Sequence, residues 1–133
     1  MFETFNKILF KRSLPARSSW RITRRWKRDL RNVSELSLLR LLAVAHRERL
    51  DVRPLVSNLA SEFRGAARRR LGRLSRQLAS GVPLVDALEQ TPDVLPDEDV
   101  LSLRFASGSG TLPQTYTELI ERAQSRPAGA AAQ

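Results

Sequence analysis

The sequence predicts an all-α fold, a compact antiparallel bundle of six helices. Apolar side chains recur at the spacing of an amphipathic helix in several segments, and glycines and prolines separate these segments. No segment shows the alternation of polar and apolar residues that indicates a β-strand. The connections between the predicted helices are short, which favours antiparallel neighbours.

The chain divides into three parts. Residues 1–33 form a basic amphipathic N-terminal arm, residues 34–124 form the helical bundle, and residues 125–133 are interpreted as a disordered tail or linker. A bundle of roughly 90 residues buries a smaller share of its surface than a large domain does. We therefore expect the bundle to associate with a partner, with a membrane or with a second copy. Association with a second copy would give a homodimer.

Charge is distributed unevenly along the chain. Residues 1–80 carry 20 Lys and Arg against 6 Asp and Glu, a net charge of +14, whereas residues 81–133 carry 3 against 8, a net charge of −5. The basic part predicts an anionic partner, and the contrast predicts attraction between the two parts, within one molecule or between copies.

The composition excludes several kinds of chemistry. The chain has no cysteine, which excludes a disulfide, a thiol nucleophile and a cysteine zinc site, and its single histidine, His46, excludes a multi-histidine metal site. It has no glycine-rich phosphate loop and no nucleophile signature. The sequence therefore predicts no catalytic residue, cofactor, metal site or small-molecule substrate.

The arm combines apolar, aromatic and basic residues. Phe2, Phe5, Ile8 and Leu9 lie at helical spacing, Pro15 ends that pattern, and a dense basic cluster with both tryptophans follows. Such a segment is typical of a helix in a membrane interface, but it also suits phosphate binding and base stacking, a tail that orders against its own domain, or a cleaved transit peptide. The candidate contacts to an anionic partner or lipid in this cluster are Trp20, Arg21, Arg24, Arg25, Trp26, Lys27 and Arg28.

The first bundle helix is predicted to begin at Ser34, a favourable N-cap, with Glu35 in its first turn. Its apolar stripe is wide, which indicates burial against more than one neighbour. A short motif, Pro-Leu-Val-x-x-Leu, then occurs at residues 54–59 and again at 83–88, each time after a longer helix. This repeat predicts two αα-hairpins.

Helix 65–80, between the two copies, has an apolar seam and an arginine-rich remainder. The seam consists of Ala67, Leu71, Leu74 and Leu78. The arginines are interpreted either as a solvated face or as a docking stripe for an acidic partner or for phospholipid. The candidate contacts from this region are Arg64, Arg68, Arg69, Arg73 and Arg76.

The acidic cluster Asp93, Asp97, Glu98 and Asp99 is interpreted mainly as negative charge at a helix N-terminus, with a metal site or a partner contact as the alternatives. Gly108 and Gly110 predict a break before a last helix, with Thr111 as its N-cap.

The order of the turn residues resembles the cytoplasmic domain of type II secretion system protein F, the inner-membrane platform protein shared with type IV pilus machines. The family has a turn and helix of the form G-x-P/S-L-x-x-A-L, a proline-containing loop, and a helix ending in S-G-x-L. The matching residues here are Gly81, Pro83, Leu84, Leu88, Pro92, Pro96, Ser109, Gly110 and Leu112.

This resemblance implies a non-catalytic scaffold of six helices at the cytoplasmic face of a bacterial inner membrane. The implied partners are the secretion or pilus assembly ATPase and other platform proteins. The chain departs from the family in having one such domain, no spanning helix, and Ser107 and Gly108 where acidic residues often stand. The basic half and the two tryptophans support an alternative, a nucleic-acid-binding protein.

Overall fold

The computed structural model describes residues 19–126, and the side chains of residues 31–126. It confirms the predicted all-α class, because the described part contains helices and no strand. The helices are α2 (Ser19–Glu48), α3 (Val52–Ser61), α4 (Gly65–Ala79), α5 (Leu84–Glu89), α6 (Asp97–Ser109) and α7 (Leu112–Gln124).

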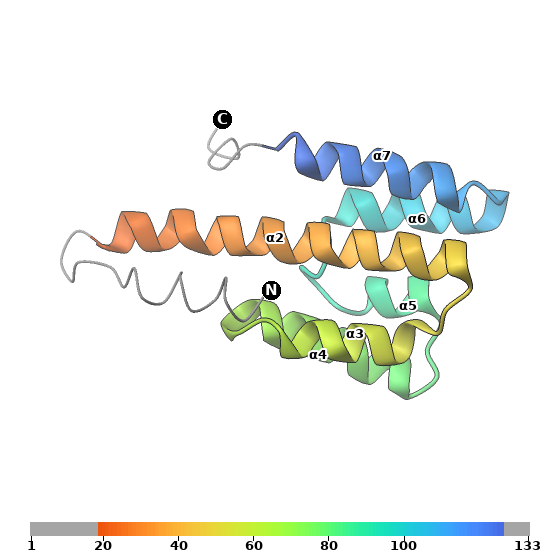
Figure 1. Cartoon of the computed structure of the whole chain (residues 1–133), viewed down its shortest axis with the longest axis horizontal. Helices are drawn as coiled ribbons and strands as arrows, with labels where there is room; N and C mark the ends of the chain where they lie inside the picture. The colour runs from red at the N-terminus through yellow and green to blue at the C-terminus, as the bar shows by residue number, and fades with distance from the viewer. Residues whose placement is uncertain (1–18, 127–133) are drawn as a thin grey trace.

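The long helix α2 organises the bundle. In Figure 1, α6 and α7 lie along one side of α2, and α3, α4 and α5 lie along the other. Helix α2 contacts α3, α4 and α7, while α3 packs most extensively against α4. The first turns of α2 extend beyond the ends of the other helices in this view.

The core lies where these layers meet. Helix α2 contributes Leu38, Leu39 and Leu42, all fully buried, and the predicted seam of α4 is buried as well. The other helices complete the same cluster from both sides of α2, with Val56, Leu88, Leu103 and Leu119 among its members. Each Å² of apolar surface removed from water contributes about 25 cal/mol to stability, so this cluster is the main source of the stability of the bundle.

The predicted turn residues lie where the helices end. Gly81 adopts φ 94° after α4, and Gly110 adopts φ 75° as the left-handed C-cap of α6, a backbone region that favours glycine. Pro83 and Pro96 are the N-caps of α5 and α6. The break predicted at Gly108 is wrong, because α6 continues through this residue and ends one residue before Gly110.

The helix start predicted at Ser34 is also wrong. Helix α2 begins at Ser19, so Ser34 lies in its interior, where the hydroxyl donates to the carbonyl of Arg31 at 2.8 Å. A serine satisfied by its own helix is compatible with the 4 % exposure of Ser34. Glu35 is consequently in the middle of α2, and the boundary drawn after residue 33 falls inside a continuous helix.

The two copies of the repeat open the two short helices that follow longer ones. Asp51 caps α3 by accepting a hydrogen bond from the Arg53 backbone at 3.0 Å, and Pro54 occupies the first turn. At the other end of the chain, Arg126 contacts Glu35 of α2, so the folded part extends past residue 124.

Candidate functional site

Most arginine side chains of α4 are exposed, and one is half-buried. Because apolar residues recur at the helical period, Ala67, Leu71, Leu74 and Leu78 face the core and leave most of the remaining surface to arginine. Four of the predicted contact residues form what we call the arginine face, and all four side chains are exposed: Arg68, Arg69, Arg73 and Arg76.

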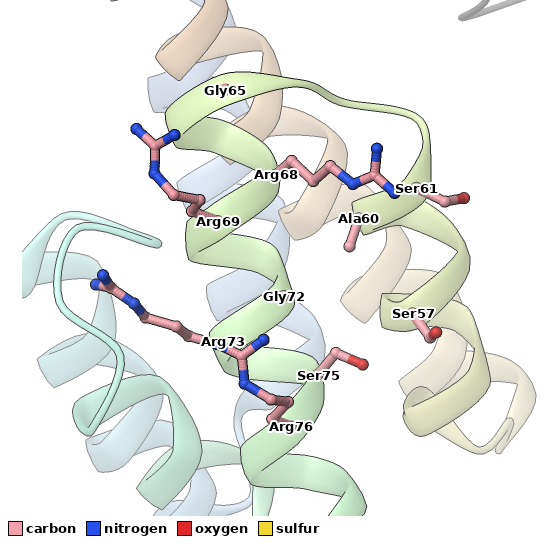
Figure 2. A pocket seen from close by; sticks show the side chains of 10 residues that line it. All are labelled: Ser57, Ala60, Ser61, Gly65, Arg68, Arg69, Gly72, Arg73, Ser75 and Arg76. Atoms are coloured by element: carbon pink, nitrogen blue, oxygen red, sulfur yellow. The ribbon is translucent and has the colours of Figure 1, made fainter.

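A hollow of about 720 Å³ lies beside the arginine face, between α3 and α4. Helix α3 lines it with Ser57, Ala60 and Ser61. Helix α4 lines it with Gly65, Gly72, Ser75 and the whole arginine face. Figure 2 shows Arg68 reaching across toward α3, whereas Arg69 and Arg73 extend from the side of α4 turned away from α3.

The arginine face has no acidic counterpart within the part of the chain that is described. None of the salt bridges there involves these four residues, and the lining of the hollow includes no carboxylate. Neighbouring helices therefore leave the positive charge uncompensated, and an anion near α4 gains attraction from several guanidinium groups at once.

Two nearby arginines differ from this face. Arg64 is the exposed N-cap residue of α4 and makes no side-chain capping hydrogen bond. Arg70 is half-buried, and burial together with the neighbouring Arg31 lowers its pKa, while Asp93 and Glu35 act in the opposite direction. Arg70 thus lies partly within the bundle, whereas Arg64 is exposed at the start of α4.

The predicted contacts of the arm lie on the first turns of α2. Their backbone is helical from Ser19 onward, but their side chains lie outside the described residues, as do residues 1–18. The binding role of this cluster stays a prediction. Its backbone belongs to the same continuous helix as the core leucines of α2.

The residues that carry the family resemblance are structural. Leu88 is buried and Leu84 and Leu112 pack against the core, while Pro92 lies in the loop between α5 and α6. The Ser109 hydroxyl lies 2.9 Å from that of Thr111, the N-cap of α7, and bridges the turn at Gly110.

The bundle also contains a buried charge cluster that the sequence did not predict. Glu35 of α2 and Asp99 of α6 are 5 % and 1 % exposed. Arg126 donates to Glu35 Oε2 at 3.3 Å, and Arg122 Nη1 lies 3.6 Å from Asp99 Oδ1, an atom that accepts no hydrogen bond. Desolvation is the main cause that raises the pKa of both carboxyl groups.

An exposed ion-pair cluster joins α5 to α6. Arg104 of α6 donates to Asp86 and Glu89 of α5, with Arg104 Nε 3.1 Å from Glu89 Oε2. The hydrogen bonds from Arg104 hold the pKa of Glu89 below its usual range. This cluster is satisfied within itself, so its arginine is not part of the uncompensated basic surface.

The acidic residues Asp97, Glu98 and Asp99 occupy the first turn of α6, as predicted. Within residues 31–126, no three acidic, histidine or cysteine side chains come together as metal ligands. The exposed His46 ring lies 6.1 Å from the ring of Tyr116, and burial raises the tyrosine pKa to about 12.

No helix in the described part is long and apolar enough to cross a bilayer. We found no match to the chain among protein-family models, curated proteins or solved structures. The site must therefore be interpreted from its own geometry and charge.

Proposed function

We propose that this chain is a non-catalytic interaction module that binds an anionic surface through the arginine face of α4. The observation that carries the proposal is the uncompensated charge of that face, beside a hollow whose lining includes no carboxylate. A merely solvated helix face usually mixes both signs of charge, because intrahelical ion pairs relieve repulsion between like charges. From Arg64 to Arg76, helix α4 has no acidic residue.

The order of the turn motifs supports a more specific form of the proposal. We propose that the bundle acts as the cytoplasmic domain of a type II secretion or type IV pilus platform does, at the cytoplasmic face of a bacterial inner membrane. There it holds the assembly ATPase or other platform proteins, and the arginine face contacts acidic partner surfaces or anionic lipid. The basic turns of α2 add to this contact.

Co-sedimentation with lipid vesicles tests the electrostatic claim. The chain is expected to bind vesicles of phosphatidylcholine mixed with phosphatidylglycerol, and to bind less as salt is added, because screening weakens contacts between exposed charges. Arg69→Ala with Arg73→Ala should reduce the partition coefficient by about 30-fold, since each basic residue near anionic lipid contributes about 1 kcal/mol.

The matched control is Arg40→Ala with Arg47→Ala, two exposed arginines of α2 that leave the same net charge. Equal losses in both double variants would mean that net charge, and not the arginine face, drives binding. Equal binding to vesicles of phosphatidylcholine alone would refute the electrostatic claim. The basic cluster of the arm should be tested by substitution, as in Arg24→Ala with Arg25→Ala, because a cut after residue 33 removes half of α2 and a cut after residue 18 leaves the cluster in place.

The nucleic-acid alternative predicts a different result. A gel-shift titration would then show tight binding at physiological salt with a steep dependence on ionic strength. Arg69→Ala with Arg73→Ala should reduce the salt slope by about two, one for each lost phosphate contact. Binding to vesicles without binding to nucleic acid supports the interaction module.

A further inference from the structure

The floor of the hollow is built from residues with little or no side chain. Ala60 of α3 and Gly72 of α4 face the space between the helices. A Cβ atom added to Gly72 would meet only the guanidinium of Arg76, at 3.7 Å. The floor is therefore open down to the helix backbone, and the arginine side chain, not the opposite helix, limits the space above it.

Guanidinium groups stand over this floor from two directions. In Figure 2, Arg68 extends across the hollow toward Ser61 at the end of α3, and Arg76 turns back along α4 toward Gly72. Neither guanidinium forms an ion pair within the described residues. Each therefore keeps its planar set of N–H donors available to a ligand.

Hydroxyl groups complete the donor set. Ser61 already donates to the carbonyl of Asn58 at 2.6 Å, so its proton is used. Ser57 and Ser75 line the same hollow and make no hydrogen bond through their side chains in the described part. The hollow thus offers two free hydroxyl donors in addition to the two guanidinium groups.

This donor set indicates the class of ligand. Guanidinium and hydroxyl donors from both helices line the hollow, with no carboxylate among them, and such a lining suits an anion whose oxygens point in several directions. A phosphate group has this form, and arginine binds it through two parallel hydrogen bonds. A volume of about 720 Å³ is in the range of sites for small molecules and headgroups.

We propose that the hollow between α3 and α4 binds a phosphate group, carried by a lipid headgroup or by a small soluble phosphate ester. This inference rests on the proposed function, since it names the chemical group that the anion-binding face recognises. Arg68 and Arg76 neutralise and orient the phosphate, Ser57 and Ser75 donate to its oxygens, and Gly72 provides the room.

The test compares anions of equal charge but different chemistry. Phosphatidylglycerol vesicles and oleate vesicles, adjusted to the same surface charge, distinguish phosphate recognition from general attraction. We expect the chain to bind the phosphatidylglycerol vesicles about tenfold more tightly, the effect of one well-made charged hydrogen bond. Glycerol 3-phosphate and malate, which both carry close to two negative charges at neutral pH, provide the same comparison for soluble ligands in a calorimetric titration.

A variant that fills the hollow makes the test specific. Gly72→Leu places a side chain on the floor without altering charge, and it replaces a helix-interior glycine with a better helix former; a urea titration followed by circular dichroism checks that the variant folds. The variant should lose the preference for phosphate. Gly108→Leu is the control, because a Cβ there meets nothing within 4 Å and the residue lies in a different helix. This control should keep the preference.

The outcomes separate this inference from the proposed function. Binding of glycerol 3-phosphate identifies a soluble ester as the source, and binding to vesicles alone identifies a headgroup. If phosphatidylglycerol and oleate vesicles bind equally, or if Gly72→Leu has no effect, the phosphate site is refuted. If Arg69→Ala with Arg73→Ala still weakens vesicle binding in that case, the interaction module stands. If that double variant has no effect either, both proposals fail.

Discussion

Replacing Asp99 by asparagine should stabilise the protein, although it removes one partner of an ion pair. The carboxylate is 1 % exposed and its Oδ1 atom accepts no hydrogen bond, so the charged form has lost its hydration without replacement. Arg122 lies 3.6 Å away, but its side chain is 49 % exposed and water screens the attraction. Asparagine keeps the shape of the side chain and removes the buried charge.

The magnitude follows from two opposing terms. A buried carboxylate without a hydrogen bond costs about 1–3 kcal/mol more than a neutral amide in the same place, because its charge has lost its hydration, and a half-exposed ion pair returns about 0–1 kcal/mol. The raised pKa of Asp99 shows that the cost of burial exceeds the attraction of Arg122 and Arg126. At neutral pH we expect Asp99→Asn to raise the free energy of unfolding by about 1 kcal/mol, or the Tm by about 4–8 °C.

The stabilisation should depend on pH in a defined direction. A carboxyl group whose pKa is raised on folding holds its proton more tightly in the native state, so the wild-type chain loses stability as pH rises through the folded pKa. Below the unfolded value of 3.8 the group is neutral in both states, and the variant and wild type should be equally stable. The extra stability of Asp99→Asn should appear as the pH rises above 3.8 and should become constant once the pH exceeds the folded pKa of Asp99.

Urea denaturation of both proteins at several pH values measures this difference. Subtracting the wild-type stability from that of the variant removes the contribution of other titrating groups, which both proteins share. One such group is Glu89, whose pKa is lowered on folding and whose effect on stability has the opposite sign. A destabilised variant at neutral pH, or a difference that does not change with pH, would refute the reasoning. The double variant with Glu35→Gln should be less stabilised than the sum of the single variants, because the Asp99 carboxylate raises the pKa of Glu35 and the two residues are therefore coupled.

Two further predictions use matched pairs in α6 and the turn that follows it. Leu103 is 0 % exposed, so Leu103→Ala should lower the free energy of unfolding by about 2–5 kcal/mol. Phe105 is 75 % exposed, so Phe105→Ser should change it by less than about 0.5 kcal/mol. Comparable losses of stability in the two variants would contradict the core described above. Gly108→Ala should stabilise the chain by about 0.5–1 kcal/mol because it lies in a helix, while Gly110→Ala at φ 75° should cost about 1 kcal/mol. Both pairs can be measured by denaturant titration followed by circular dichroism, and a Gly110→Ala variant as stable as Gly108→Ala would argue against the left-handed cap.

The sequence predicted the parts of the fold that depend on local signals. Gly81 and Gly110 end helices because glycine adopts positive φ at little cost, and Pro96 begins one because its φ suits that position. The apolar seam of α4 was also predictable from a local signal, because the helical spacing of its apolar residues is visible in a single sequence. Local patterns also located the arginine face.

Features that depend on contacts between distant segments were not predictable. Ser34 has the same appearance in a sequence whether it caps a helix or bonds back within one, although Ile22, Trp26, Leu30 and Val33 before it do recur at helical spacing. Glu35 and Arg126 are 91 positions apart, and Asp99 resembles an ordinary acidic residue at a helix start. Only the packing of α2, α6 and α7 brings these charges together and buries them.

The continuity of α2 has a mechanical consequence. A helix of 30 residues is about 45 Å long, and this one has no proline or glycine at which to bend. Its second half packs in the core, and its first half continues from it without a break in the helix. If a partner binds those first turns, as proposed, it also orients the bundle, because no proline or glycine interrupts the helix between them and the core leucines.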